Sequence, residues 1–589
     1  MHDRAVWKLS LVAAFLISTP AVFAQSPAAQ QAPASNAQAT VLHLTSNLVL
    51  VDVVVTDKGK AVLDLDRTKF HLFEDGKEQA ISAFDEHQPA AAAVALPTPP
   101  ALPPHTYNNT PIHAETGVFN VLLLDGLNTP ATDQMRVRQQ MIEYMGKIQP
   151  GTMMAVFTLS TRMGLRMATG FTTDPAQLTK TVKDQKTDIP TLLAGPTAPD
   201  PLDSLQSYFD GMGGGPAVSS MRAFEGDIAS QILEERVRMT LDAMKQLGLY
   251  LSAIPGRKNL IWFTGSFPAA IDPQGSAASP LQDMPAYSED VRKTDELLMA
   301  ARVAVYPVDA RGLMTLLPYG ASSGSQNPSG DSAAFTVQLD AEHGAMREIA
   351  EQTGGQAYIN TNGLKEAVAR AVENGNSYYT LAYTPASKKF DGQFHRIQVS
   401  VDAQGWGDQL AYRRGYYADS PEKPAMKSFK GLSPFLASTM HGAPPATQVL
   451  LQARVLPASD PLFAGVKLDD DPGGEMTASL KGQAHRTIVD LTIDAHTLAF
   501  NTTPAELHQA SFECTLVAYD ANGKRLNYVD GMIPVDLKAN QYAQILSTGI
   551  PLRLAIDLPA GQYFLRIAVH DKNADHVGAL EVPVMVAAK

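Results

Sequence analysis

One pentapeptide has the spacing of a serine nucleophile. Gly320-Ala321-Ser322-Ser323-Gly324 matches the Gly-x-Ser-x-Gly turn on which serine hydrolases present their nucleophile between a strand and a helix. The pentapeptide lies within residues 318–331, which are rich in Gly, Ser, Asn and Pro and show no helical pattern directly after the turn. We find no base partner for Ser322, so a serine hydrolase is a remote alternative and we expect no catalytic residue.

Other residue patterns that could carry chemistry are weak. The 14 histidines form no His-Glu-x-x-His or comparable cluster. Gly211-Met212-Gly213-Gly214-Gly215 lacks the preceding strand of a dinucleotide-binding turn, so no organic cofactor is expected. The single cysteine, Cys514, stands in an alternating strand pattern, which favours a small buried residue over a reactive thiol. Asp309 ends an apolar run and is expected to be a polar residue at the end of a strand.

The first residues predict export. Arg4 and Lys8 precede the apolar run Leu9 to Ala21, and small residues then lead to Ala24. This pattern is typical of a signal peptide cleaved after Ala24, which predicts a periplasmic or secreted protein. The alternative, a membrane anchor, is disfavoured because Pro20 interrupts the run. No later run of about 20 apolar residues occurs, so we expect no membrane span in the mature chain.

Length and charge restrict the remaining possibilities. A chain of 589 residues is too long for one core and predicts several domains. The formal net charge of −13 argues against nucleic acid as the main partner, because phosphate binding needs a basic face. One cysteine permits no intramolecular disulfide, so stability must come from apolar cores.

Composition and periodicity divide the chain into segments. These are a signal peptide (1–24), a flexible linker (25–40), an N-terminal β segment (41–88), an Ala/Pro-rich linker (89–116), an α/β segment (117–375), a second β segment (376–418), a third linker (419–447) and a C-terminal β-sandwich (448–589). The two short β segments are each too small to hold a core alone. We therefore expect them to pair into one sandwich into which the α/β segment is inserted.

The α/β segment alternates short apolar runs with helical patterns. Strands are expected at 118–124, 153–159, 259–263, 303–308 and 356–359, and helices at 133–148, 174–182, 227–254, 288–301, 342–353 and 364–372. This alternation predicts a doubly wound, mostly parallel sheet with helices on both faces.

Three long loops are expected at the carboxyl ends of the parallel strands, where open α/β sheets bind ligands. They cover residues 190–226, 265–287 and 310–339. Their larger apolar side chains would suit a protein-binding surface and are Tyr208, Phe209, Met212, Met221, Phe224, Phe267, Tyr287 and Tyr319. The alternative is that these side chains pack on their own domain.

A series of motifs carries a family resemblance. They are Val51–Asp57 with Phe73–Gly76, Leu124–Thr129, Phe171–Pro175, Ile349–Gly355 and Tyr412–Tyr417. In this order they resemble the von Willebrand factor type A (vWA)-related proteins of acidobacteria. The resemblance implies a multidomain α/β plus all-β chain, in which a vWA-like sheet is flanked by Ig-like β-sandwich units. It implies architecture more than activity, because the family has no well-defined biochemical role.

The resemblance also implies a metal site in degenerate form. The metal-ion-dependent adhesion site (MIDAS) of vWA domains takes an Asp and two hydroxyls from a first loop, a Thr from a second and an Asp from a third, and binds Mg²⁺. Asp125 and Thr129 match the first loop, and Thr197 aligns with the second. Leu127 and Gly265 replace a hydroxyl and the second carboxylate.

We therefore predict an exported, non-enzymatic interaction or scaffold protein. It would bind a protein or cell-envelope partner through the loops at the carboxyl ends of the vWA-like strands, without a metal. The alternative is metal-dependent adhesion, with Mg²⁺ held by Asp125, Thr129 and Thr197.

Overall fold

The computed structural model describes most of the chain. The described residues are 48–88, 102–110, 118–187, 192, 215–254, 256–266, 285–313, 328–385, 392–402, 409–418, 433–463, 473–474, 484–503, 506–520 and 523–587. The predicted signal peptide, Thr197, the Ser322 pentapeptide and most of the three segments expected as long loops lie outside them. The expectation of loops is wrong for residues 215–226, 285–287 and 328–339, which are helical.

The α/β segment forms a five-stranded mixed sheet in the order β11-β10-β7-β8-β9. Its strands are β7 (Phe119–Asp125), β8 (Met154–Ser160), β9 (Gly164–Thr172), β10 (Lys258–Thr264) and β11 (Val303–Asp309). The first four in spatial order are parallel, and β9 is antiparallel to β8. The four parallel strands are almost wholly buried along their length, as expected of a sheet covered on both faces.

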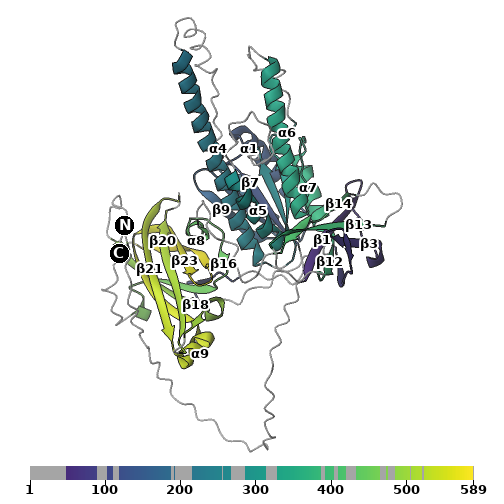
Figure 1. Ribbon diagram of the computed structural model, residues 1–589. Helices are drawn as coiled ribbons and strands as arrows, with labels where there is room; N and C mark the ends of the chain where they lie inside the picture. Colours follow the sequence, from purple (N-terminus) through teal and green to yellow (C-terminus); the bar gives the residue numbers. More distant parts are fainter. Residues whose placement is uncertain are drawn as a thin grey trace, which may run out of the picture.

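Helices cover both faces of this sheet (Figure 1). They are α1 (Ala131–Met145), α2 (Pro175–Asp184), α4 (Gly215–Ser252), α5 (Pro285–Ala300), α6 (Pro328–Thr353) and α7 (Leu364–Gly375). One core joins the sheet to α4, α5 and α6, and a second core joins the opposite face to α1, α2 and α7. The sheet is therefore doubly wound, as predicted. The strand expected over 356–359 is only a bridge between Val308 and Tyr358.

Strands from before and after the α/β segment share one N-terminal β unit. Its two antiparallel sheets have the orders β14-β1-β12-β5, with β2 beside β1, and β15-β13-β3-β4. The strands are β1 (Val49–Asp57), β2 (Lys60–Ala61), β3 (Phe70–Glu74), β4 (Lys77–Gln79), β5 (Ala83–His87), β12 (Tyr378–Tyr383), β13 (Phe394–Val401), β14 (Gln409–Ala411) and β15 (Gly415–Tyr417). A single core lies between the sheets, because neither sequence segment buries enough apolar surface alone.

The last part of the chain forms a C-terminal β unit, also of two antiparallel sheets. Their orders are β16-β24-β23-β20-β19, with β21 beside β20, and β22-β18-β17-β6. The elements are β6 (Thr106–Asn108), α8 (Pro434–Ser438), β16 (Ala446–Thr447), β17 (Leu451–Pro457), β18 (Ala484–Ile493), β19 (Asn501–Thr502), β20 (His508–Tyr519), β21 (Arg525–Leu537), α9 (Ala539–Thr548), β22 (Ile550–Pro559), β23 (Gly561–Asp571) and β24 (His576–Val586). Cys514 lies in the core of this unit, where burial raises the pKa of its thiol.

Two segments expected to be linkers contribute to this unit. Residues 106–108 form β6, which pairs with β17, so part of the segment 89–116 is an edge strand. Within the segment 419–447, α8 and β16 pack against the unit, and Phe435 joins a small core there. Short pieces such as these have no periodicity of their own and depend on the partner strand.

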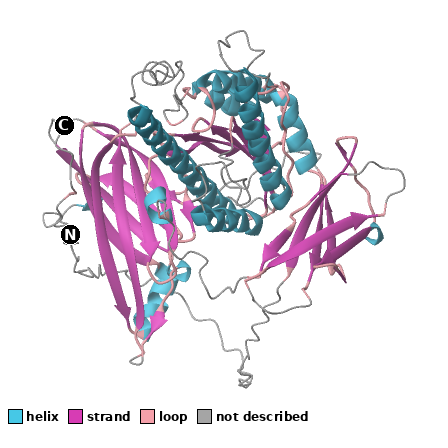
Figure 2. Ribbon diagram, turned by 45° about the horizontal axis from the view of Figure 1, so that its top comes forward, coloured by secondary structure: helices cyan, strands magenta, loops and turns pink. Residues whose placement is uncertain are grey.

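The C-terminal β unit lies against the α/β domain (Figures 1 and 2), on the side where Figure 1 labels β9. The backbone N–H of Met167 in β9 donates to the Gly442 carbonyl at 2.7 Å.

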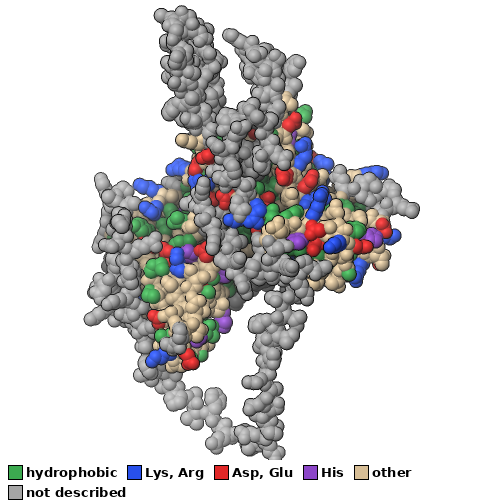
Figure 3. Space-filling model, in the orientation of Figure 1, with side chains coloured by type: hydrophobic (Ala, Val, Ile, Leu, Met, Phe, Trp, Pro, Cys, Tyr) green, Lys and Arg blue, Asp and Glu red, His purple; other side chains and the backbone are tan. Residues whose placement is uncertain are grey.

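Acidic and basic side chains are interspersed over the face shown in Figure 3. None of the described helices combines the length and apolarity needed to cross a membrane.

Candidate functional site

The carboxyl ends of β7, β8, β10 and β11 meet at one edge of the sheet, here called the apical edge. Each of these strands ends in a polar residue: Asp125, Ser160, Thr264 and Asp309, respectively. Along the chain β8 is added on one side of β7 and β10 on the other, so Asp125 lies where the strand order reverses. Open α/β sheets bind ligands at this position.

Asp125 is 2% exposed and accepts hydrogen bonds from protein donors. Its Oδ1 accepts from the backbone N–H of Asn128 at 2.9 Å. Its Oδ2 accepts from Asn128 Nδ2 at 2.9 Å and from Trp262 Nε1 at 3.0 Å. Burial raises the pKa of Asp125, while the hydrogen bonds from Asn128 and Trp262 act to lower it. Both carboxylate oxygens therefore have partners within the domain.

Asn128 connects this carboxylate to an arginine on α4. Asn128 Nδ2 also donates to Thr240 Oγ1 at 2.9 Å, and its Oδ1 accepts from Arg236 Nη2 at 3.1 Å. Arg236 Nη2 donates further to Ser266 Oγ at 2.6 Å. Burial lowers the pKa of Arg236, and the Asp125 charge opposes this shift. Arg236 thus brings a positive charge to the apical edge close to the Asp125 carboxylate.

The two positions at which this chain departs from the vWA metal motif have structural roles. Leu127 is fully buried in the core between the sheet and α4, α5 and α6. Gly265 N–H donates to Thr129 Oγ1 at 2.9 Å. A Cβ at position 265 would lie 2.9 Å from the Asn128 carbonyl oxygen and 2.9 Å from Pro130 Cδ. The backbones approach so closely that no side chain fits at position 265 without a shift.

These contacts do not fit the Mg²⁺ site that the resemblance implies. Such a site needs about six oxygen ligands in an octahedron. Here Asp125 and Thr129 already accept hydrogen bonds from protein N–H groups, and Leu127 and Gly265 offer no ligand. Thr197 lies outside the described residues.

A second polar cluster holds the end of β11. Asp309 is fully buried and accepts from His343 Nε2 at 2.8 Å and from Arg311 Nε at 3.0 Å. Arg311 Nη1 also donates to Glu342 at 2.6 Å. Burial acts to raise the pKa of Asp309, but the hydrogen bonds from His343 and Arg311 lower it overall. Sequence reasoning placed Asp309 at a strand end without identifying this network, which fastens α6 to β11.

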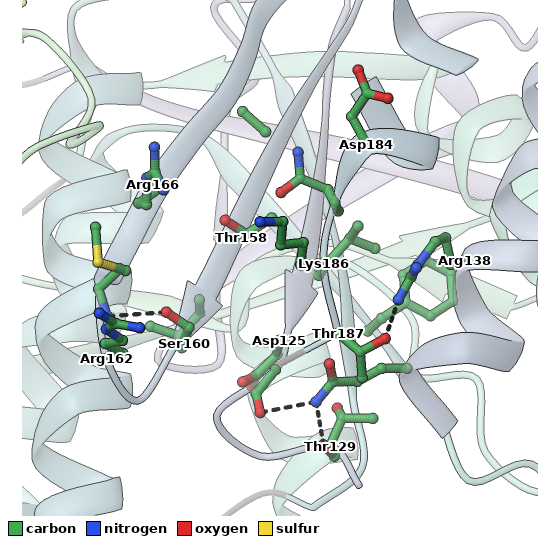
Figure 4. A pocket seen from close by; sticks show the side chains of 18 of the residues that line it. Asp125, Thr129, Arg138, Thr158, Ser160, Arg162, Arg166, Asp184, Lys186 and Thr187 are labelled. Carbon is green, nitrogen blue, oxygen red and sulfur yellow. Dashed lines mark hydrogen bonds between the residues drawn. The ribbon is translucent and has the colours of Figure 1, made fainter. Parts of the chain in front are cut away.

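A cavity of about 800 Å³ opens beside Asp125 at the β7–β8 side of the apical edge. It is lined by β7, β8, β9, β10, α1, the end of α2 with the residues after it, and a turn of the C-terminal β unit. Its cationic side chains are Arg138, Arg162, Arg166, Lys186 and Lys524, and its carboxylates are Asp125, Asp184 and Asp520. Figure 4 shows Arg162 and Arg166 on one side of this cavity and Arg138, beside Thr187, on the other. Sequence reasoning missed this group because its members come from distant parts of the chain.

Comparisons with known proteins give structural neighbours only. No family model matches the chain, and no curated protein matches its sequence. A von Willebrand factor type A structure from Catenulispora acidiphila is similar at 10% identity and a TM-score of 0.24, over 62% of this chain and 79% of that one. The VWA domain of SpRpn10 is similar at 10% identity and a TM-score of 0.17, over 41% of this chain and 87% of that chain. Proximal thread matrix protein 1 from the mussel byssus is similar at 11% identity and a TM-score of 0.21, over 44% of this chain and 47% of that chain. The structural neighbours thus include vWA domains at low similarity, and the relation to acidobacterial proteins stays a prediction.

Proposed function

We propose that this chain is a non-enzymatic interaction protein whose vWA-like domain binds a protein partner at the apical edge without a divalent metal. The observation that carries the proposal is the exposure of two large apolar side chains there. Met135, in the first turns of α1, is 54% exposed, and Leu313, just after β11, is 61% exposed. The described part of the chain buries most of its other large apolar side chains, and exposed apolar groups at a ligand-binding edge favour a protein partner.

Contacts between their chain neighbours bring these two residues to the same region. Arg136 Nη2 donates to the Ala310 carbonyl, and Leu313 N–H donates to Asn362 Oδ1 at 2.9 Å. Asp125, Asn128 and Asp309 at this edge have hydrogen-bond partners within the domain, so this part of the edge is held in shape before any partner arrives. Such preorganisation reduces the entropic cost of binding.

The metal-free part of the proposal rests on Arg236. Its guanidinium supplies positive charge near Asp125, where a vWA metal site would have a cation. Metal-dependent adhesion would require Asp125 to release Asn128 and Trp262 and to leave water-exposed ligand positions for the ion. We also propose export, on the signal-peptide pattern, which predicts that the mature chain begins at Gln25.

Site-specific photocrosslinking tests the proposed surface. A photoreactive amino acid is placed at Met135 or Leu313, and at Met585 as a matched control, because Met585 is 68% exposed on β24. Each protein is irradiated with the envelope fraction of the organism that encodes it, once in EDTA and once without it. We expect one adduct of the same mass from both apical positions and none at Met585. Adducts at all three positions alike, adducts abolished by EDTA, or none at the apical positions would contradict the proposal.

A further inference from the structure

The cavity beside Asp125 is a basic cleft in an acidic protein. The whole chain has a net charge of −13, yet five cationic side chains line this cavity against three carboxylates. One of the three, Asp125, is buried and already accepts three hydrogen bonds. The cleft is therefore positively charged, although the protein as a whole is negatively charged.

Two of the cations are held in place by neighbours. Arg138 donates to Thr187 Oγ1, which joins α1 to the residues after α2. Arg166 on β9 lies 3.1 Å from His441 Nε2, and His441 Nδ1 lies 3.0 Å from Glu581 of the C-terminal β unit. Burial lowers the pKa of Arg166, with Glu581 opposing the shift. These contacts fix two guanidinium groups as walls of the cleft.

Two other cations are exposed. Arg162 lies in the turn between β8 and β9, and Lys186 lies just beyond α2. Neither forms an ion pair with another residue of the described ranges. Hydroxyl groups of Thr158 and Ser160 line the cleft between these elements. Exposed cations beside hydrogen-bonding groups can pair with carboxylates of a ligand.

The cleft also has apolar lining. Leu124, Val137, Met163, Met167 and Phe263 contribute to its wall. A compact inorganic anion would leave this apolar surface and most of the roughly 800 Å³ unused. A peptide that alternates carboxylates with apolar side chains would meet both kinds of lining.

We propose that the basic cleft binds an acidic, partly apolar peptide segment of the protein partner. This inference rests on the proposed function and names the chemistry of the segment that the partner presents. The cleft is lined by the α/β domain and by the turn at Asp520 and Lys524, so a bound segment contacts both units.

A titration with defined peptides tests the inference. The probe is a fluorescently labelled octapeptide that alternates Glu and Leu, and the reference peptide has Gln in place of Glu. The protein is the mature chain, residues 25–589, at low ionic strength, and the readout is fluorescence anisotropy. The cleft variant carries Arg162→Glu with Lys186→Glu. The matched control carries Lys69→Glu with Lys77→Glu, two exposed cations of the N-terminal β unit, and changes the net charge equally.

We expect the Glu peptide to bind the wild-type chain and the control alike, and the Gln peptide not to bind. The cleft variant should weaken binding by about tenfold, since two ligand ion pairs become repulsions. Arg162→Gln with Lys186→Gln should weaken binding less than the charge-reversed variant does. This milder variant keeps the test valid if the charge-reversed variant misfolds. Absence of binding to the wild type, equal binding of the Gln peptide, or equal losses in the cleft variant and the control would overturn the inference.

Failure of this inference is distinguishable from failure of the proposed function. The peptide titration needs no natural partner, whereas the crosslinks at Met135 and Leu313 need no acidic peptide. Crosslinks that persist while the Glu peptide fails to bind would overturn only the chemistry assigned to the basic cleft.

Discussion

Replacement of Arg236 by methionine removes the positive charge that acts on the Asp125 carboxylate. Arg236 donates to Asn128 Oδ1 from Nε at 3.3 Å and from Nη2 at 3.1 Å, and to Ser266 Oγ at 2.6 Å. Hydrogen bonds from a charged donor contribute about 1.5–3 kcal/mol each, and a buried carboxylate that loses its counter-charge adds to the cost. Because Arg236 keeps some contact with solvent and two of its bonds share one acceptor, we expect a loss of about 3 kcal/mol in the free energy of unfolding.

The loss should depend on pH with a defined sign. Burial already raises the pKa of Asp125, and the attraction between Arg236 and Asp125 acts to lower it. Without Arg236 the folded-state pKa of Asp125 rises further, so the charged carboxylate is penalised at neutral pH. Protonation removes the penalty as pH falls through the folded-state pKa. The stability deficit of Arg236→Met should therefore be larger at pH 8 than at pH 5 (about 1 kcal/mol larger).

Urea unfolding followed by the fluorescence of Trp262, in a Trp406→Phe background, measures this deficit in the α/β domain. A double-mutant cycle with Asp125→Asn separates the charge interaction from the loss of packing. We expect a coupling of about 1–2 kcal/mol between the two substitutions. Additive effects, or a deficit independent of pH, would refute the idea that Arg236 acts as the counter-charge of Asp125.

Three further predictions concern other parts of the fold. Burial and Glu348 raise the pKa of Asp295 to about 7 from 3.8. Because the folded state then favours the protonated carboxyl, the free energy of unfolding should fall as pH rises from about 4 to about 7. Asp295→Asn should flatten that slope in thermal melts, and an unchanged slope would contradict the assignment. Arg566 is 1% exposed and donates to the carbonyls of Ser438, Ala443 and Pro444, so Arg566→Met should destabilise the C-terminal β unit by about 3 kcal/mol in calorimetric unfolding. Gly265→Asp supplies the carboxylate that the vWA motif has at this position. Because a side chain does not fit there without a shift, we expect the α/β domain to lose about 2 kcal/mol of stability and to gain no Mg²⁺ affinity. Tight Mg²⁺ binding by this variant would show that the backbone can move to accommodate the side chain.

Strongly patterned parts of the fold could be predicted from the sequence. The runs that became β7, β8, β10 and β11 are mostly apolar, with few polar residues between their ends, which is typical of strands buried on both faces. The start of α2 was also predictable, since Asp174 caps it through the backbone N–H of Ala176 and Pro175 follows at the first position.

Other elements carry little signal of their own. β9 mixes Gly, Arg and Thr with apolar residues and was not anticipated, because its place is set by β8 and by Gly442 of the C-terminal β unit. β6 is three residues long within a Pro-rich stretch and exists through β17. Tertiary pairing decides strands of this kind.

Residues of the candidate site also differ in whether the sequence alone could predict them. Asp125 was found because it ends a buried strand within a family-like motif. Arg236 was not found, because it lies 108 residues away from Asn128 in sequence, on a helix where an arginine is unremarkable. The five cations of the basic cleft come together only through folding of two units.

Calorimetric titration of residues 25–589 with Mg²⁺, Mn²⁺ and Ca²⁺, beside an Asp125→Ala control, tests the central claim most directly. The contacts of Asp125 with Asn128 and Trp262, and the charge of Arg236, predict no saturable heat with any of the three ions. Saturable binding that disappears in Asp125→Ala would contradict the account, because it would show that the carboxylate exchanges its protein donors for a metal ion.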